Sequence, residues 1–241
     1  MRLLGYSKGT WSGPSPGAAD SLRTRPRLLL IVAATCASAA LLQAQASSAA
    51  QLAQERAQAE IEIPKLVEVL ALKPSMTVAD VGAGGGAMTV VLAKWLASGR
   101  VLATDINPSF LAEIREYAKR EALSNVTLIE GAPASTNLPA SCCDAILMRN
   151  VYHHLTEPET FITSVIASLK PGGQLAIIDF PARPGSALPK GVRANREGNG
   201  IPSSLGVQEV RAVGLTHVQT IQNWPTGDKA LVSYLTLFRK P

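Results

Sequence analysis

Between residues 77 and 180, short apolar segments of strand length alternate with longer segments of helical periodicity. The apolar segments are nearly continuous, which is typical of parallel strands that are buried on both faces. Helices that connect parallel strands cover both faces of their sheet. The predicted strands are residues 77–81, 101–105, 126–130, 143–149 and 175–180, and the predicted helices are residues 87–97, 109–122 and 159–169.

The last third of the chain departs from this alternation. Residues 181–202 are rich in Pro, Gly and Arg and are predicted to form a loop. A short helix is expected at residues 207–213, with Gly214 as its C-cap. Residues 216–222 and 229–239 then read as two strands of an antiparallel hairpin. The prediction is therefore an α/β fold, with a doubly wound, mostly parallel seven-stranded sheet and a C-terminal antiparallel hairpin.

The net charge of +5 is concentrated at the front of the chain. Residues 1–27 hold five basic residues and one acidic residue, whereas residues 28–241 hold 18 basic and 17 acidic residues. Residues 28–241 therefore do not carry the excess of basic side chains that a nucleic-acid face needs. A hydrophobic fraction of 46% with only 17% charged residues also excludes a disordered chain.

The same front segment has the pattern of a targeting leader. No charged residue occurs between Arg27 and Glu55, and residues 28–42 are all apolar or small. This run is short for a membrane span but suits the core of a signal peptide, and Ala44-Gln45-Ala46 provides a cleavage site. We expect residues 1–46 to be a signal peptide that directs export to the periplasm. An organelle transit peptide and a membrane anchor are the alternatives.

Two further segments complete the expected domain organisation. Residues 47–62 are rich in Ala, Gln and Glu and are predicted to be a helical linker. A separate helix is then expected to begin at Ile63-Pro64, because Pro is favoured in the first turn of a helix. The folded domain is accordingly predicted to span residues 63–241.

A glycine-rich loop, Asp80-Val81-Gly82-Ala83-Gly84-Gly85-Gly86, joins the first predicted strand to its helix. Glycines there permit a sharp turn and a close approach of backbone to a ligand. Its D-x-G-x-G-x-G spacing differs from the G-x-G-x-x-G of dinucleotide folds, and a carboxylate at this point suits an ammonium group better than a pyrophosphate. Asp105 ends the second strand, where an acid can bind both hydroxyls of a ribose.

Five segments together carry a family resemblance. They are DVGAGGG at 80–86, TDIN at 104–107, EGAPASTNLP at 130–139, CDAILMRNVYHHL at 143–155 and LKPGGQLAIIDF at 169–180. From about residue 63 to residue 180 the chain resembles the small, single-domain class I S-adenosylmethionine-dependent methyltransferases. The resemblance implies a Rossmann-like methyltransferase fold and S-adenosyl-L-methionine as the methyl-donor cosubstrate.

The resemblance also implies which residues hold the donor. The glycine loop would hold its methionine end, Asp105 its ribose and Ile106 one face of its adenine. Many relatives place an acid beside the adenine amine, where this chain has Ala132, so only the backbone can serve there. Asn150 would lie where the methionine end meets the acceptor. The expected donor-binding residues are Asp80, Gly82, Ala83, Gly84, Asp105, Ile106, Gly131, Ala132 and Asn150.

Methyl transfer from a sulfonium is an in-line displacement, so alignment of the acceptor is the main task and can contribute about 7–11 kcal/mol. A general base is needed only when the acceptor retains its proton. His153 and His154 follow the fourth strand and are the candidate bases, with His153 slightly preferred, and Tyr152 is a candidate for the acceptor pocket. Adjacent histidines without a third ligand at metal spacing do not predict a metal site.

The acceptor is expected to be a small or envelope-associated molecule and not a nucleic acid. Residues 183–201 are expected to form a lid whose Arg193 and Arg196 contact an anionic acceptor, with a solvated basic loop as the alternative. No stable membrane span is expected in the mature form, and the oligomeric state is left open. Two other functions are the alternatives: a non-catalytic module that binds S-adenosylmethionine or S-adenosylhomocysteine, and a nicotinamide-dependent oxidoreductase, which the glycine spacing disfavours.

Overall fold

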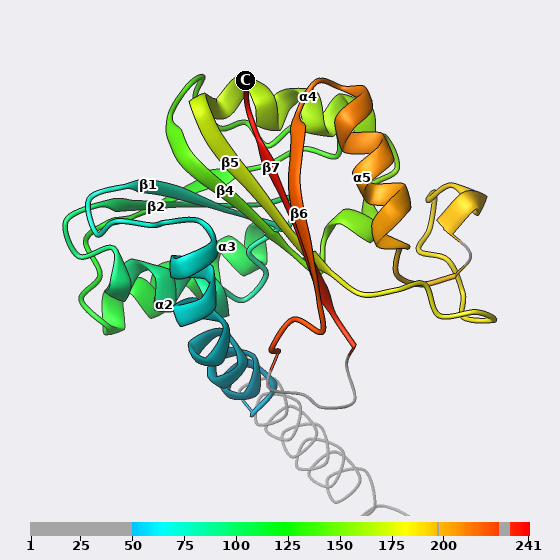
Figure 1. Cartoon of the computed structure of the whole chain (residues 1–241). Coiled ribbons are helices and arrows are strands. Elements are labelled where there is room, and N and C mark those ends of the chain that lie inside the picture. Colours follow the sequence, from blue (N-terminus) through cyan, green and yellow to red (C-terminus); the bar gives the residue numbers. More distant parts are fainter. Residues whose placement is uncertain (1–49, 197, 227–231) are drawn as a thin grey trace, which may run out of the picture. The chain divides into compact units, whose positions relative to one another are not determined.

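A seven-stranded sheet forms the centre of the part of the chain that the computed structural model describes, which is residues 50–196, 198–226 and 232–241 (Figure 1). The strand order is β3-β2-β1-β4-β5-β7-β6. Strands β1 to β5 pair in parallel, and β7 pairs antiparallel with both β5 and β6. The bounds are β1 Thr77–Val81, β2 Arg100–Asp105, β3 Val126–Glu130, β4 Cys143–Arg149, β5 Leu169–Asp179, β6 Thr216–Gln222 and β7 Tyr234–Arg239. The predicted α/β fold is confirmed.

Helices cover both faces of this sheet. In Figure 1, α4 and α5 lie on one side of the sheet and α2 and α3 on the other. The helices are α2 Ala87–Trp95, α3 Pro108–Arg120, α4 Pro158–Ser168 and α5 Ser203–Ala212, with 3-10 turns η1 Tyr152–His154 and η2 Ala194–Arg196. Residues 50–69 form a further helix. The four helices predicted after the first strand are therefore present, and each begins within four residues of its predicted start.

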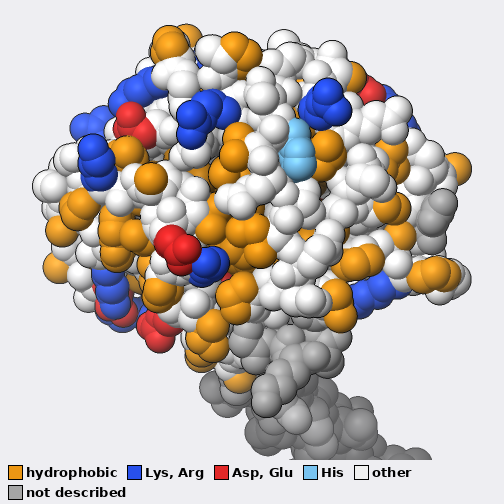
Figure 2. Space-filling model, viewed as in Figure 1, with side chains coloured by type: hydrophobic (Ala, Val, Ile, Leu, Met, Phe, Trp, Pro, Cys, Tyr) orange, Lys and Arg blue, Asp and Glu red, His pale blue; other side chains and the backbone are white. Residues whose placement is uncertain are grey.

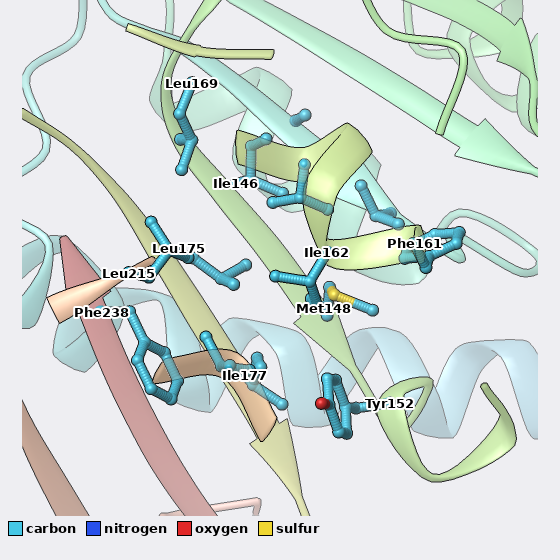
Figure 3. Packing of buried hydrophobic residues seen from close by; sticks show 14 of the residues in the cluster. Ile146, Met148, Tyr152, Phe161, Ile162, Leu169, Leu175, Ile177, Leu215 and Phe238 are labelled. Atoms are coloured by element: carbon cyan, nitrogen blue, oxygen red, sulfur yellow. The ribbon is translucent and has the colours of Figure 1, made fainter. Parts of the chain in front are cut away.

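Two hydrophobic layers hold the sheet between these helices. On the α4 and α5 side, Ile146 and Met148 of β4 pack with Ile162 of α4 (Figure 3). The alternate residue Leu147 points to the opposite layer, which contains residues of α2 and of the helix at 50–69. Because strand side chains alternate between faces, β4 contributes to both layers and is buried on both sides.

The helix at residues 50–69 is continuous, so the predicted helix start at Ile63-Pro64 is wrong. A proline inside a helix costs about 3 kcal/mol, but Ala59, Ile63 and Leu66 are buried against the sheet and offset that cost. Residues 50–62 of the expected linker lie in the same compact unit as the rest of the described chain. The predicted leader, residues 1–46, lies outside the described residues.

A buried glutamate links this helix to the end of β4 and to Trp224, which follows β6. Glu62 Oε1 accepts a hydrogen bond from Arg149 Nε at 2.8 Å and forms an ion pair with Arg149 Nη2 at 2.7 Å, and Glu62 Oε2 accepts a hydrogen bond from Trp224 Nε1 at 2.9 Å. Glu62 and Trp224 are both buried. These partners lie 87 and 162 residues away in sequence, which is why local composition could not reveal them.

Strand β5 begins at Leu169, earlier than the predicted residue 175. The Lys170-Pro171-Gly172-Gly173 run does end α4, but it then continues as strand. Gly172 has a φ of 73° and donates to the Lys240 carbonyl at 3.2 Å, and Lys240 donates back to the Gly173 carbonyl at 2.8 Å. Because Gly172 and Gly173 pair with a segment about 70 residues away, they form part of a strand, although their local sequence is typical of a turn.

The start of β7 also differs from its prediction, because the strand begins at Tyr234 and residues 232–233 precede it. Residues 229–231 lie outside the described residues. The predicted antiparallel pairing of β6 with β7 is confirmed, with a register shift between His217 and Gln219.

Charged side chains of both signs are interspersed with apolar ones on the face shown in Figure 2. Within the described residues, no helix has both the length and the apolar character needed to cross a membrane.

Leu66→Ala is expected to lower the free energy of unfolding by about 2–5 kcal/mol, because it leaves a cavity under the first helix. Urea unfolding followed by circular dichroism measures the change. Ile61→Ala is the matched control, since Ile61 is on the same helix and 51% exposed, and should change the value by about 0.5 kcal/mol or less. Equal effects of the two substitutions would mean that the helix does not pack on the domain.

Candidate functional site

The glycine loop between β1 and α2 is tied to the end of β2. The N–H groups of Gly82 and Ala83 donate to the Thr104 carbonyl at 2.8 and 3.1 Å, and the Gly84 N–H donates to Asp105 Oδ2 at 2.9 Å. These three donors are therefore engaged within the protein. The loop offers a ligand its surface and carbonyl groups, and not the row of free N–H groups that a phosphate requires.

Glycine is required at two positions of this loop, for reasons that differ in part. A Cβ at Gly82 would lie 2.4 Å from Val151 Cγ2, so the residue that follows β4 packs directly on the loop. Gly84 has a φ of 51°, and a Cβ there would meet no atom within 4 Å. Gly82 is thus required both by its φ of 71° and by the close approach of Val151, whereas Gly84 is required by its backbone conformation alone and faces open space.

The open space is a cavity of about 520 Å³ at the carboxyl ends of the parallel strands. Its walls come from the loops that follow β1, β2, β3 and β4, at the point where the strand order reverses between β1 and β4. Such switch points are where open α/β sheets bind ligands, and this volume is ordinary for a small-molecule site. The lining residues are Val81, Gly82, Gly84, Thr104, Asp105, Ile106, Phe110, Gly131, Ala132, Pro133, Ser135, Thr136, Val151, His154, Leu155, Thr156, Phe161 and Lys190.

Asp105 is the one acidic side chain among these lining residues. Its Oδ1 accepts from the Asn107 N–H at 2.8 Å, and its Oδ2 accepts from the Gly84 N–H at 2.9 Å. A carboxylate has about four acceptor positions, so each oxygen retains one for a ligand. The site can therefore bind a pair of neighbouring hydroxyl groups.

Apolar surface flanks Asp105. Ile106 and Phe110 are 62% and 38% exposed, which is unusual for side chains of this kind and places them on the cavity wall. Gly131 donates to the Asp105 carbonyl at 3.0 Å, which brings the turn after β3 to the same wall. A flat apolar ring next to a diol fits this arrangement.

The structure brings seven of the predicted site residues to the cavity and leaves five outside it. Those on its wall are Gly82, Gly84, Asp105, Ile106, Gly131, Ala132 and His154. Those that do not line it are Asp80, Ala83, Asn150, Tyr152 and His153. The backbone N–H of Asn150 donates to the Ile178 carbonyl at 2.8 Å, and Asn150 has a φ of 55°.

Asp80 lies behind the glycine loop, against the start of α2. Its carboxylate is buried and accepts a hydrogen bond from Thr89 Oγ1 at 2.6 Å. Burial raises the pKa of Asp80 to about 6, while hydrogen bonds from Thr89 and the charge of Arg149 lower it and Asp105 raises it. A carboxylate thus already occupies the N-terminal end of α2, where dinucleotide folds place a pyrophosphate.

The 3-10 turn η1 separates the three candidate catalytic side chains. A 3-10 helix has three residues per turn, so consecutive side chains point in different directions. Tyr152 points into the core (Figure 3), where its hydroxyl donates to Glu209 Oε2 at 2.9 Å and burial raises its pKa above the usual range. His153 is also buried, and its Nδ1 is 2.8 Å from Asp179 Oδ1.

His154 is the member of this turn that reaches the cavity wall. Partial burial lowers the pKa of His154 below its ordinary value, the neighbouring His153 lowers it further, and Asp179 acts in the opposite direction. A neutral imidazole at the cavity is able to accept a proton near pH 7.

Arg193 and Arg196, which were expected to contact an anionic acceptor, do not line the cavity. Arg193 forms a two-pronged ion pair with Glu159, at 2.6 and 2.5 Å. Arg196 is fully buried, and its Nη1 donates to Glu209 Oε2 at 2.9 Å. The loop instead contributes Lys190, which sequence reasoning missed.

Several further cavity residues that were not predicted lie close in sequence to predicted site residues. Phe110 lies in the first turn of α3, close in sequence to Asp105 and Ile106, and Leu155, Thr156 and Phe161 follow the histidine pair into α4. Among the described residues, no group of three or more His, Cys, Asp or Glu side chains is arranged to hold a metal ion.

Comparisons with known proteins agree with this geometry. The family described as "Methyltransferase domain" matches residues 79–177. The ubiquinone/menaquinone biosynthesis C-methyltransferase UbiE of Shewanella halifaxensis is 28% identical over 116 residues, which are 47% of this chain and 46% of that protein. The chain thus matches about half the length of this curated relative.

Solved structures share the fold. A SAM-dependent methyltransferase from Aquifex aeolicus has a TM-score of 0.60 and 23% identity, over 74% of this chain and 89% of that one. Phosphoethanolamine N-methyltransferase 2 of Haemonchus contortus, solved in complex with S-adenosyl-L-methionine, has a TM-score of 0.59 and 13% identity, over 75% of this chain and 52% of that one.

Asp80→Asn is expected to change how stability depends on pH. Because the pKa of Asp80 is raised in the folded chain, Asp80 stays protonated to a higher pH in the folded chain than in the unfolded chain. The free energy of unfolding therefore falls as the pH rises from about 4 through 6. The loss should be on the order of 3 kcal/mol by pH 7. The variant does not titrate there, so its stability relative to wild type should rise between pH 4 and pH 7.

Urea unfolding at both pH values measures this difference. Glu130→Gln, at an exposed acid, serves as the control. A difference between Asp80→Asn and wild type that is the same at pH 4 and pH 7 would contradict the raised pKa of Asp80.

Proposed function

Since residues 79–177 belong to the class I S-adenosylmethionine-dependent methyltransferase family, we propose that the chain transfers a methyl group from S-adenosyl-L-methionine to a small acceptor. The observation that carries the proposal is the cavity in which Asp105 and the glycine loop meet, with Ile106 and Phe110 beside them. These features match a nucleoside whose ribose hydroxyls bind the carboxylate and whose adenine packs on the apolar wall.

The residues present fit this donor. Asp105 has acceptor positions left for the ribose hydroxyls, and the open face at Gly84 leaves room for the methionine end of the donor. Gly131 and Ala132 provide backbone groups beside the adenine position. When bound, the donor supplies an activated methyl group on a positively charged sulfur.

The acceptor half of the cavity is proposed to lie around the start of α4. Leu155, Thr156 and Phe161 line it, and the loop that carries Lys190 packs there, because a Cβ on Gly191 would be 3.1 Å from Thr156 Cγ2. These walls exclude water and align the acceptor with the methyl group, which is the largest contribution that a protein makes to this reaction. His154 is placed to accept a proton from the acceptor.

The acceptor itself is proposed only as a small molecule. The curated relative acts in ubiquinone/menaquinone biosynthesis, as its name states, so a phenolic or quinol ring is the first acceptor class to assay. Methyl incorporation from radiolabelled donor, with thiols and carboxylic acids as further classes, tests this choice.

The engaged N–H groups of the glycine loop argue against the nicotinamide alternative. A pyrophosphate needs free N–H donors at the helix start, and here Gly82, Ala83 and Gly84 use theirs internally while Asp80 occupies the helix end. Calorimetry with S-adenosylhomocysteine and with NAD separates the two functions. Preferential binding of NAD would contradict the proposal, and donor binding without turnover of any acceptor class would favour a binding module.

Asp105→Ala is expected to weaken S-adenosylhomocysteine binding about 10- to 100-fold, because charge-assisted hydrogen bonds to the ribose are worth about 1.5–3 kcal/mol. Calorimetry measures the affinity, and circular dichroism checks the fold. Glu130→Ala is the matched control, since Glu130 pairs with Asp105 in the sheet register but does not line the cavity. Unchanged affinity in Asp105→Ala would refute the ribose assignment.

Residues 1–46 are proposed to act as an export leader. N-terminal sequencing of the protein from the periplasmic fraction is expected to begin at Ser47. An exported enzyme has to obtain a donor that is made in the cytoplasm. The same fractions should therefore be assayed for bound S-adenosylmethionine. Protein that retains Met1 and remains in the cytoplasm would contradict this proposal.

A further inference from the structure

Asp179 ends β5 with a completely buried carboxylate that receives three hydrogen bonds. Its Oδ1 accepts from His153 Nδ1 at 2.8 Å and from the Phe180 N–H at 2.9 Å, and its Oδ2 accepts from the His153 N–H at 3.1 Å. Asp179 thus holds both the backbone and the ring of His153. Since Nδ1 faces a carboxylate oxygen, it carries the ring proton.

The His153 ring in turn contacts the residue at the cavity wall. Its centroid lies 4.0 Å from that of His154, with 40° between the ring planes, and 4.7 Å from that of Phe180 on another side. His153 is 3% exposed, whereas His154 lines the cavity. A rigid, hydrogen-bonded ring therefore supports one face of the imidazole that meets the acceptor.

Packing alone does not account for this pair. An aromatic hydrocarbon ring at position 153 could contact both His154 and Phe180 without a buried carboxylate beside it. A buried charged or hydrogen-bonded pair gains little stability over apolar packing, because its desolvation cost is high. What the pair adds is a fixed orientation for the His153 ring, and through it for His154.

We propose that Asp179 and His153 are positioning residues that hold the His154 imidazole at the cavity wall, where it accepts the proton of the methyl acceptor. This inference rests on the proposed function. As the lone pair of the acceptor atom forms its bond to the methyl carbon, the sulfur–methyl bond breaks and its electron pair stays on sulfur, which leaves S-adenosylhomocysteine. The acceptor proton moves to the free ring nitrogen of His154, which then releases it to water.

The charged and titratable groups around His154 are few. His153 and Asp179 lie behind it, and Asp105 and Lys190 are on the wall of the same cavity. Asp179 acts directly to raise the pKa of His154. If Asp179 influenced His154 only through its charge, its removal would lower that pKa.

When Asp179 is replaced, a positioning role and a purely electrostatic role predict opposite changes in the pKa of His154, so one experiment separates them. Asp179→Asn has one acceptor oxygen where the carboxylate has two, so it cannot hold both the backbone and the ring of His153. His154 then loses its support and its partial burial, so its pKa is expected to rise toward the ordinary value near 6.5. The nuclear Overhauser cross-peak between the two rings should also be lost. NMR titration of the full chain saturated with S-adenosylhomocysteine measures both, and the chain has only three histidines to assign.

The controls keep this test separate from folding and from the proposed function. His217→Gln identifies the third imidazole signal and should leave the other two unchanged, because His217 lies on β6 against Phe238. S-adenosylhomocysteine affinity within about twofold of wild type shows that Asp179→Asn is folded. If that variant does not fold, Asp179→Glu makes the same test, since it keeps the negative charge but moves the carboxylate by one methylene away from the His153 ring, and the inter-ring cross-peak should also be lost.

A pKa of His154 that falls or stays unchanged in Asp179→Asn, or an inter-ring cross-peak that persists in the variant tested, overturns the inference while donor binding stands. Failure of the wild-type chain to bind S-adenosylhomocysteine overturns the proposed function instead. With an acceptor in hand, Asp179→Asn should lower kcat about 10-fold or more and leave the acceptor KM nearly unchanged.

Discussion

The attachment of the glycine loop to the end of β2 is the interaction on which the rest of the site depends. The Thr104 carbonyl and the Asp105 carboxylate together accept three consecutive N–H groups of the loop. These bonds set the height of the loop above the sheet, and Val151 then fits against Gly82 because no side chain stands between them. Asp105 therefore has two tasks, since the oxygen that holds the loop belongs to the group that faces a ligand.

Residues that follow β4 complete the site by dividing its tasks among neighbouring side chains. Tyr152 joins the core through Glu209, His153 is held by Asp179, and His154 reaches the cavity. Buried hydrogen bonds on two sides thus restrict a turn of only three residues. A short turn with two of its three side chains anchored keeps the third in place at small entropic cost, which is what a reaction governed by alignment requires.

The sequence was informative where local pattern decides structure and uninformative where distant pairing does. The boundaries of β1 and β4 follow from apolar runs of strand length, because both faces of the sheet are covered there. The boundaries of the edge strands β3 and β6 also agree with their prediction, although their side chains are only partly buried. The early start of β5 could not be predicted, since it depends on Lys240, and neither could the uninterrupted first helix, which depends on Arg149 and Trp224. In the site, Asp105 and the glycines could be recognised by their spacing. Which of two adjacent histidines faces the cavity depends on how the 3-10 turn is rotated relative to the sheet, which residue types do not specify.

The buried Glu62 has a consequence for the order in which the chain can acquire its structure. This carboxylate lies in the first described helix, yet the groups that neutralise and satisfy it are placed by the end of β4 and by the residues after β6. During synthesis the helix emerges well before Trp224, so its stable docking must wait until most of the sheet has been made. A contact that spans 162 residues closes a long loop, and such closure is slow compared with the formation of the helix itself. The helix at residues 50–69 therefore gains its full set of buried hydrogen bonds only after β6 and Trp224 have been made.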